Sequence, residues 1–457
     1  MLQLIADAVD DRSARGIAAA VSRLVHAGQL PAGARLPTVR SVAQQLGISP
    51  TTVSEAWRSL AAAGAIETRG RSGTFVRIPA RPREQLRYAR LAAQPAALPT
   101  DLSTGVPDHD LLPDLTEALH RVRDARLTTS YLDEPVLPEL ESVLRQRWPF
   151  PPARLTVVDG ALDALDRITT TVVRLGDRVI VENPTFPPML DLLESAGAIP
   201  VPVPLDAAGL VPGALAEALD DRVVAVYLQP RAQNPTGVSM TPARSEELAG
   251  VLAQHSDVIV VEDDHAGDIA TAPAVSVGTH LPERTVRVHS FSKSHGPDLR
   301  LAAVAGAAPV LTSIADRRLL GPGWSSRLLQ LILLDLLTDA ATATVVAHAA
   351  TAYAHRRQAL VTALAARGAV ATADDGINLW LSVGNQQLAM LSLAARGIAV
   401  APGAPFEAGP LGADHVRVTA GLVRADFDAL ATVLAEAAGV TARGSGRRSF
   451  PLQRGTR

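Results

Sequence analysis

The chain has 457 residues, more than one ordinary domain needs, and 47% of them are hydrophobic while 19% are charged. This composition is typical of a folded protein with a large core and excludes wholesale disorder or a collagen-like repeat. The absence of cysteine excludes disulfides, zinc-thiolate sites and cysteine nucleophiles. The acidic N-terminal segment is unlike a secretory signal and no uncharged apolar run reaches about 18 residues, so the sequence predicts a cytoplasmic protein.

The formal net charge of −3 hides an uneven distribution. Residues 1–80 carry +4 and residues 441–457 carry +5, which leaves −12 for the residues between them. Among the 43 Lys and Arg residues, Lys293 is the single lysine. Because arginine stands everywhere else, position 293 is the first place to look for chemistry that needs an amine.

Three short helices and a hairpin are predicted near the N-terminus. An apolar helical pattern runs through residues 17–25, and two further helices are predicted to follow Pro37 and to begin at Ser49 as N-cap, each ending at a glycine. Two short strands follow around a glycine-bearing turn, at 65–69 and 74–77. This order predicts a winged helix-turn-helix within residues 1–78.

Short polar side chains at the N-terminal end of the second helix of such a unit can read base edges in the major groove of DNA. Arginines on the preceding helix, one turn further on and near the wing can neutralise phosphates or contact bases. The alternative interpretation is a solvated charged face on a small helical domain. The predicted DNA-contacting residues are Arg40, Ser49, Thr51, Thr52, Ser54, Arg58, Arg69 and Arg71.

Residues 79–100 contain four prolines and are predicted to be a linker with a short helix around residues 84–93. In residues 101–440, strand-like apolar runs alternate with helical patterns, which predicts a mostly parallel α/β sheet. The basic tail at 441–457 is predicted to be disordered. The predicted strands are 154–158, 178–181, 223–228, 258–261, 286–289 and 301–305.

Lys293 follows an apolar strand in the segment Ser-Phe-Ser-Lys, and Arg300 stands seven residues further on. A lysine that forms a Schiff base with a phosphate-bearing aldehyde needs such a polar neighbourhood, because hydroxyls and an arginine can clamp a phosphate dianion. A lone lysine after a strand is also an ordinary surface charge. The motifs that accompany Lys293 favour the chemical interpretation.

These motifs follow other strands. Asn234, in Asn-Pro-Thr-Gly, offers an amide at the carboxyl end of a strand. The segment Glu-Asp-Asp-His at 262–265 ends the next strand, and one of its carboxylates could keep a pyridine nitrogen protonated. The turn at Gly160 exposes N–H groups to a phosphate, and Phe186 can stack on a ring. Taken singly, they are also typical of a turn, a solvated loop and a helix start. Together they predict a cofactor site.

Roughly residues 15–78 resemble the winged-helix domain of the GntR family of bacterial repressors. The resemblance is carried by Leu-Pro-Thr-Val-Arg-Ser-Val-Ala at 36–43, Leu-Gly-Ile-Ser at 46–49 and Gly-Thr-Phe-Val at 73–76. It implies double-stranded operator DNA as a partner. Pro50 stands where many members have a base-contacting residue, which implies an operator that differs from the family norm.

Residues 101–440 resemble the fold-type I pyridoxal-phosphate aminotransferases. The resemblance implies that Lys293 carries pyridoxal 5'-phosphate as an aldimine and that Asp263, rather than Asp264, pairs with its pyridinium nitrogen. It implies that Arg417 binds the carboxylate of a substrate or effector; the alternative is a sheet-edge arginine. The implied cofactor-binding residues are Tyr131, Gly160, Ala161, Leu162, Phe186, Asn234, Asp263, His265, Ser290, Ser292, Lys293 and Arg300.

Within this set, the resemblance gives the ring hydroxyl to Asn234 and ring stacking to Phe186. It implies that the phosphate is bound by Ser290, Ser292, Arg300 and the amides of Ala161 and Leu162. It also implies that Tyr131 reaches the phosphate bound in the partner subunit. His265 stands where the family has tyrosine; it can donate a similar hydrogen bond and is expected to titrate near neutrality. Val136 stands where a glycine is usual, so that loop is expected to take another path, and either change could weaken transamination.

A GntR-like domain, a linker of about twenty residues and an aminotransferase-like body form the layout of the MocR subfamily of transcriptional regulators. This resemblance implies a homodimer whose body senses pyridoxal phosphate, alone or with an amino acid or amine, and thereby changes operator binding. A catalytically active aminotransferase that carries a DNA-binding domain is the alternative. A regulator that has lost its cofactor is a third interpretation, against which the retained Lys293 argues.

Overall fold

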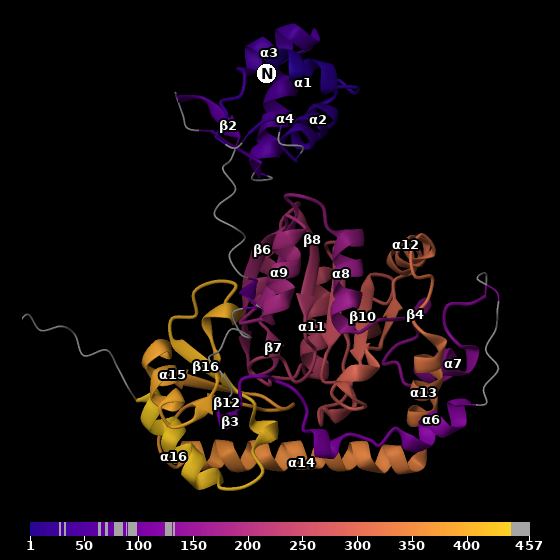
Figure 1. Ribbon diagram of the computed structural model, residues 1–457, viewed down its shortest axis with the longest axis vertical. Helices are drawn as coiled ribbons and strands as arrows, with labels where there is room; N and C mark the ends of the chain where they lie inside the picture. The colour runs from indigo at the N-terminus through magenta and orange to yellow at the C-terminus, as the bar shows by residue number, and fades with distance from the viewer. Residues whose placement is uncertain are drawn as a thin grey trace, which may run out of the picture.

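The structure is a computed structural model. It describes residues 1–26, 29–31, 33–62, 65–68, 72–76, 86–87, 89, 98–123, 130 and 133–439. Figure 1 shows an N-terminal helical domain, drawn in indigo, and a larger α/β body. Within the described part of the chain, no single helix is long and apolar enough to cross a membrane, and one pair of helices meets that test only across a bend of 78°.

The N-terminal domain contains a helix-turn-helix and a wing, as predicted. Gly47 ends one helix with a φ of 65°, a left-handed conformation that turns the chain toward the next helix. Ser49 caps that next helix, because its Oγ accepts the Thr51 N–H at 3.1 Å. The elements are α1 (Leu2–Ala8), α2 (Ala14–His26), α3 (Val39–Leu46), α4 (Pro50–Ala62) and the antiparallel strands β1 (Ile66–Thr68) and β2 (Thr74–Val76).

An eight-stranded sheet forms the centre of the body, in the order β4-β11-β10-β9-β8-β5-β6-β7. The neighbours from β10 to β6 are parallel, while β11 runs antiparallel to β10 and β4, and β7 antiparallel to β6. The mostly parallel α/β prediction is confirmed. The strands are β4 (Arg154–Val158), β5 (Arg178–Asn183), β6 (Ile199–Asp206), β7 (Gly209–Leu210), β8 (Val223–Leu228), β9 (Ile259–Asp264), β10 (Thr285–Ser290) and β11 (Ala302–Gly306).

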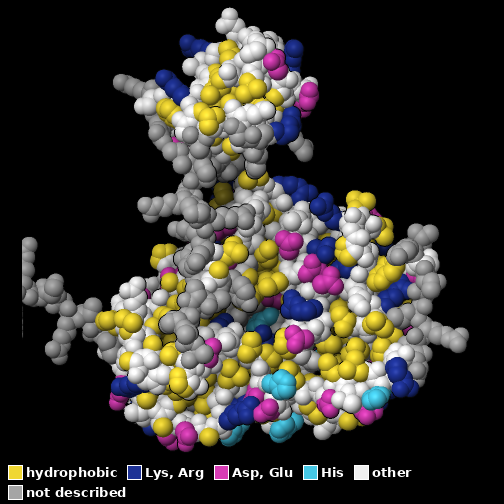
Figure 2. Space-filling model, viewed as in Figure 1, with side chains coloured by type: hydrophobic (Ala, Val, Ile, Leu, Met, Phe, Trp, Pro, Cys, Tyr) yellow, Lys and Arg dark blue, Asp and Glu magenta, His cyan; other side chains and the backbone are white. Residues whose placement is uncertain are grey.

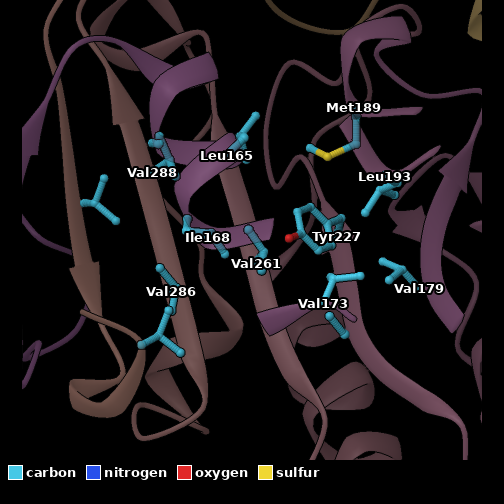
Figure 3. Close-up of a cluster of buried hydrophobic side chains, with 14 of the residues drawn as sticks. Leu165, Ile168, Val173, Val179, Met189, Leu193, Tyr227, Val261, Val286 and Val288 are labelled. Carbon is cyan, nitrogen blue, oxygen red and sulfur yellow. The ribbon is translucent and has the colours of Figure 1, made fainter. Parts of the chain in front are cut away.

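Helices cover both faces of this sheet, since successive side chains of a strand point to opposite sides. Val179 and Val181 pack in one cluster with three helices, whereas Ile180 packs in another cluster with two. Figure 3 shows the first cluster, with Tyr227 among its labelled side chains. The Tyr227 hydroxyl lies 3.0 Å from Thr169 Oγ1. The first face carries α8 (Ala161–Val172), α9 (Pro187–Ser195) and α12 (Ala308–Leu319), and the second carries α10 (Pro212–Ala218) and α11 (Pro242–Leu252).

A smaller sheet completes the body, in the order β12-β13-β16-β15. The long helix α14 runs along one end of the body (Figure 1), and β3 pairs parallel with β14 beside the small sheet. These elements are α14 (Ala340–Ala365), β3 (Thr100–Asp101), β12 (Ala371–Thr372), β13 (Leu379–Val383), β14 (Ile398–Ala399), β15 (Ala401–Pro402), β16 (Asp414–Val418), α15 (Gln386–Ala394) and α16 (Phe427–Ala438). The other α-helices in the described residues of the body are α6 (Thr116–Arg123), α7 (Pro138–Gln146) and α13 (Arg327–Thr338).

Candidate functional site

A cavity of about 540 Å³ lies at the carboxyl ends of β8, β9 and β10, where parallel α/β sheets bind ligands. The segment 98–107 and the small domain close its other sides. The structure brings these predicted residues together in its lining: Ala161, Leu162, Phe186, Asn234, Asp263, His265, Ser290, Ser292, Lys293, Arg300 and Arg417. Tyr131 lies outside the described residues.

Lys293 reaches the cavity from the turn that follows β10. Phe291 fixes this turn, because its ring is 1% exposed and packs in a cluster with Leu301 and Leu333. Burial and the positive charge of Arg417 lower the pKa of Lys293 to about 8, although Asp263 acts in the opposite direction. Near neutral pH, more of this amine is therefore neutral, and able to act as a nucleophile, than in a solvated lysine.

Asp263 and Asp264 end β9 with different surroundings. Asp263 lines the cavity; its Oδ2 accepts Gln229 Nε2 at 2.8 Å, while its Oδ1 is buried without a hydrogen-bond partner. Burial raises its pKa to about 6. Because a buried oxygen without a partner is costly, Oδ1 is suited to a donor that a ligand brings.

Asp264 points into a buried ionic network instead. Arg231 donates to both of its oxygens at 2.8 Å, and Arg287 Nη2 and His289 Nδ1 lie 2.9 and 3.0 Å from Oδ2. Although burial raises it, the pKa of Asp264 lies well below its ordinary value because Arg287, His289 and Arg231 stabilise the anion. Its hydrogen-bonding capacity is used within the fold, which leaves Asp263 as the carboxylate available to the cavity.

His265 departs from the prediction made from its sequence position. Burial, with the nearby charge of Lys293, lowers its pKa to about 4, so the prediction that it titrates near neutrality is wrong. Its Nε2 lies 2.7 Å from the carbonyl oxygen of Ala232, which only accepts, so Nε2 carries the proton. The neutral ring then presents Nδ1 as an acceptor, and the donor role expected of His265 is not available while this bond holds.

Val136, the other departure from the family pattern, serves the core of the body. It is 4% exposed and packs with Leu140 and Leu144 of α7. The valine side chain is therefore accommodated by the fold.

Gly160 and Arg300 form the anion-binding end of the cavity. Gly160 caps α8 with a φ of 99°, and a Cβ at this position would lie 2.7 Å from Arg300 Nη2. The guanidinium therefore lies against the start of the helix, where free N–H groups and the helix dipole attract anions. The hydroxyl-bearing Ser290 and Ser292 line the same cavity. Together these groups suit a phosphate.

Arg417 lies on β16, which is an interior strand of the small sheet between β13 and β15. The alternative of a sheet-edge arginine is therefore wrong. The residue is 3% exposed, and its guanidinium contacts Asn234 Oδ1 at 3.4 Å, the carbonyl of Ser103 and the Phe406 ring at 5.2 Å. It stands in the cavity lining as a fixed cation opposite Lys293.

Several lining residues escaped the sequence-based prediction. Gln229 directly follows β8 and stands five residues before Asn234 of the Asn-Pro-Thr-Gly motif, and its position next to a strand end was a usable signal. The segment Ser103-Thr104-Gly105-Val106-Pro107 contacts the site through the tertiary fold, because Gly105 packs against the Arg417 guanidinium. No local pattern of the sequence indicates this contact between the segment 103–107 and Arg417.

The predicted DNA-contacting residues lie in the N-terminal domain. The structure exposes four of them: Arg40, Ser49, Thr51 and Arg58. Thr52 and Ser54, which lie on α4, are half-buried. Figure 2 shows dark blue basic side chains at several places on the surface of this domain. Arg69 and Arg71 lie outside the described residues.

Comparisons with known proteins agree with both parts of the structure. Residues 13–76 match the family of bacterial regulatory proteins of the gntR type, and residues 99–434 match aminotransferase class I and II. Among solved structures, a multiple substrate aminotransferase from Thermococcus profundus superposes with a TM-score of 0.69 at 21% identity, covering 79% of this chain and 95% of the other. An aspartate aminotransferase variant from Thermus thermophilus gives a TM-score of 0.67 at 24% identity, covering 74% and 96%.

Curated relatives cover both domains at once. The vitamin B6 salvage pathway transcriptional repressor PtsJ of Salmonella typhimurium is 34% identical over 403 residues, which are 87% of this chain and 92% of that protein. The probable rhizopine catabolism regulatory protein MocR of Rhizobium meliloti is 28% identical over 73% of each chain. The chain therefore belongs to the MocR-type regulators of the gntR family, in which a gntR DNA-binding domain precedes an aminotransferase class I and II domain.

Proposed function

We propose that this protein is a transcriptional regulator that binds operator DNA as a homodimer and changes its affinity for DNA when pyridoxal phosphate binds at Lys293. One observation carries the proposal: a single cavity holds an amine whose pKa is about 8, a carboxylate oxygen without a partner and a cradle for an anion. These three features match the aldehyde, the ring nitrogen and the phosphate of the cofactor.

The residues present fit pyridoxal phosphate. Asp263 Oδ1 would hold the protonated ring nitrogen, Asn234 the ring hydroxyl, and Phe186 the ring face. The start of α8, with Ser290, Ser292 and Arg300, would hold the phosphate. The cofactor would supply the aldehyde with which the Lys293 amine condenses, and Lys293, at its lowered pKa, can release the proton that this condensation requires.

The proposed effector site is the space beside Arg417. This arginine is buried, fixed by three neighbours and close enough to Lys293 to lower the pKa of that lysine. A fixed guanidinium binds a carboxylate with good geometry. We therefore infer that an amino acid can act together with the cofactor, while the cofactor alone remains the minimal signal.

Regulation follows from coupling two binding sites. A ligand shifts DNA affinity by the difference between its affinities for the DNA-bound and the free arrangement of the protein. Two basic heads on one dimer can span two half-sites, and the acidic body discourages other DNA contacts. A regulator that binds DNA acts where the DNA lies, so the proposal includes a cytoplasmic location.

Operator binding by the full chain tests the proposal. DNA flanking the gene of this protein is titrated with the wild type and with Lys293→Arg, each with and without pyridoxal phosphate. Arginine keeps the charge but cannot condense with an aldehyde, so we expect the cofactor to change DNA affinity at least fivefold in the wild type alone. Equal DNA affinity in all four conditions would overturn the sensing function.

A further inference from the structure

We propose that Gln229 is a positioning residue that sets which oxygen of Asp263 exchanges a proton with the cofactor ring. This inference rests on the proposed function, since it concerns the same cavity. Gln229 is 5% exposed and directly follows β8, which pairs with β9, the strand that ends at Asp264. It lines the cavity, and no sequence motif gave it a role.

The Gln229 side chain joins two residues of the site. Its Oε1 accepts the backbone N–H of Asn234 at 2.8 Å, and its Nε2 lies 2.8 Å from Asp263 Oδ2. The two contacts hold the groups proposed to face the ring nitrogen and the ring hydroxyl. One amide therefore fixes the spacing of both.

The direction of the two hydrogen bonds made by Gln229 determines which oxygen of Asp263 can carry a proton. A backbone N–H can only donate, so Oε1 must face Asn234, and the Nε2 amine must then donate to Asp263 Oδ2. Oδ2 is consequently an acceptor and cannot carry a proton toward Gln229. Any proton on Asp263, or shared with a ring nitrogen, is directed to Oδ1, which is the oxygen without a partner.

The same hydrogen bond acts on the charge of Asp263. Burial raises the pKa of this carboxyl to about 6, and the bond from Gln229 is the largest effect that lowers it. Asp264 on the same strand raises it further, while Lys293 and Arg287 from the neighbouring strand region lower it. Glu182, on β5, also interacts with Asp263; burial raises the pKa of Glu182 to about 8, and the charge of Asp263 contributes to that shift.

Gln233 offers a matched control in the same loop. It is 1% exposed, its Oε1 accepts the Thr236 N–H at 3.1 Å, and its Nε2 donates to Glu182 Oε2 at 3.2 Å and to the Pro184 carbonyl at 2.8 Å. Gln233 thus bridges the loop in the manner of Gln229. None of these bonds reaches Asp263.

The isosteric variants Gln229→Glu and Gln233→Glu separate positioning from loop stability. In Gln229→Glu the backbone of Asn234 keeps its acceptor, but a carboxyl group faces Asp263 Oδ2 in place of the amide donor, and two buried carboxyls at this distance share a proton. This change raises the pKa of Asp263, so a larger share of the carboxyl is neutral at a given pH. Circular dichroism shows whether each variant is folded, and fluorescence titration with pyridoxal phosphate from pH 5 to pH 9 gives the affinity.

Binding requires the Asp263 anion, so affinity falls as the pH drops below the pKa of this carboxyl. We expect Gln229→Glu to weaken affinity at least tenfold at pH 7 and to move the acidic fall in affinity upward by about one pH unit, with no such movement in Gln233→Glu. Lys293 is present in all three chains and, with a pKa of about 8 in the wild type, it shapes the alkaline side of each profile. Equal pH profiles for the two variants would overturn the inference, as would a Gln229→Glu chain that is unfolded while Gln229→Asn, folded, keeps the wild-type profile. Absence of binding by the wild type would instead overturn the proposed function.

Discussion

The lowered pKa of the Lys293 amine predicts that the rate of cofactor loading depends on pH. Its pKa is lowered to about 8, so the neutral fraction falls about tenfold for each pH unit below 8 and levels off above it. We expect the rate at which pyridoxal phosphate loads onto the chain to follow this curve. Borohydride reduction and peptide mass spectrometry measure the product, which should lie at Lys293 because the chain has no other lysine. A loading rate that is flat between pH 6 and pH 8 would contradict this role of the amine.

The contact between Gly160 and Arg300 predicts that a side chain at position 160 weakens binding of the cofactor's phosphate. Gly160→Ala would place a Cβ 2.7 Å from Arg300 Nη2 at a φ of 99°, which displaces the guanidinium and strains the start of α8. We expect affinity for pyridoxal phosphate to fall about tenfold, while affinity for pyridoxal, which lacks the phosphate, changes little. Gly176→Ala is the control, because Gly176 also has a positive φ, 86°, but a Cβ at that position would meet no atom within 4 Å. Equal losses for the two ligands would show that strain alone is responsible.

The identities of the site residues were more predictable than their protonation and their hydrogen bonds. Lys293 and Asn234 follow strands and Asp263 lies near the end of one, so their meeting at one sheet edge follows from the parallel topology. The state of His265 did not follow, because its pKa depends on burial and on the Ala232 carbonyl, which tertiary structure brings to it. Gln229 was missed for the same reason: its partner, Asp263, is 34 residues away in the sequence.

At the scale of elements, six strands of the large sheet were predicted, whereas β6 and the strands of the small sheet were not. β6 contains prolines at alternate positions, a pattern that argues against an interior strand. The Ile199 N–H bonds the Asp177 carbonyl beside β5, so the intervening residues, Pro200, Pro202 and Pro204, direct their missing N–H groups to the other side. On that side β7 pairs only at Leu205 and Asp206, which is why the prolines are tolerated.

The helix α1 was missed because it is short and has no side-chain cap. Ile5 nevertheless is fully buried and packs with Ile17 and Val42 of the helices that follow. Its stability comes from tertiary packing, which local sequence patterns do not reveal.

The contact between α9 and Arg87 predicts a route by which the cavity communicates with the N-terminal domain. It begins directly after Phe186, which lines the cavity, and its residues Asp191 and Glu194 bind Arg87 from the segment that leads to the N-terminal domain. The two terminal nitrogens of Arg87 each donate to Glu194 at 2.7 Å, and its backbone N–H donates to Asp191 at 3.1 Å. A shift of Phe186 on a bound ring would therefore reach the linker through one rigid helix.

We expect Arg87→Ala to reduce the effect of pyridoxal phosphate on DNA affinity at least threefold, with cofactor affinity and the melting temperature nearly unchanged, because partly exposed ion pairs contribute little to stability. Arg244→Ala is the control, since Arg244 makes a similar double contact with Asp206 at 2.8 Å on the second face of the sheet. Gel-shift titrations with and without cofactor measure the effect. An equal response in the wild type and Arg87→Ala would contradict this route.

At the scale of the whole molecule, charge is divided between basic ends and an acidic body. The basic +4 of residues 1–80 and the +5 of residues 441–457 flank a body of −12. Counterion release makes the salt dependence of DNA affinity a count of the phosphates that a protein neutralises. The sequence of the tail contains five arginines and no acid, so its contribution can be measured separately from that of the winged helix.

We expect replacement of the five tail arginines by glutamine to weaken binding to nonspecific DNA and to reduce the slope of log affinity against log salt by between about one and four, at about 0.9 for each lost phosphate contact. The response of operator binding to pyridoxal phosphate should persist, because the cavity lies wholly within residues 98–417. A chain that ends after residue 439 is the control: if the tail acts through charge, both chains lose the same slope. An unchanged slope would assign the DNA affinity to the winged helix alone, and a lost cofactor response would show that the tail takes part in sensing.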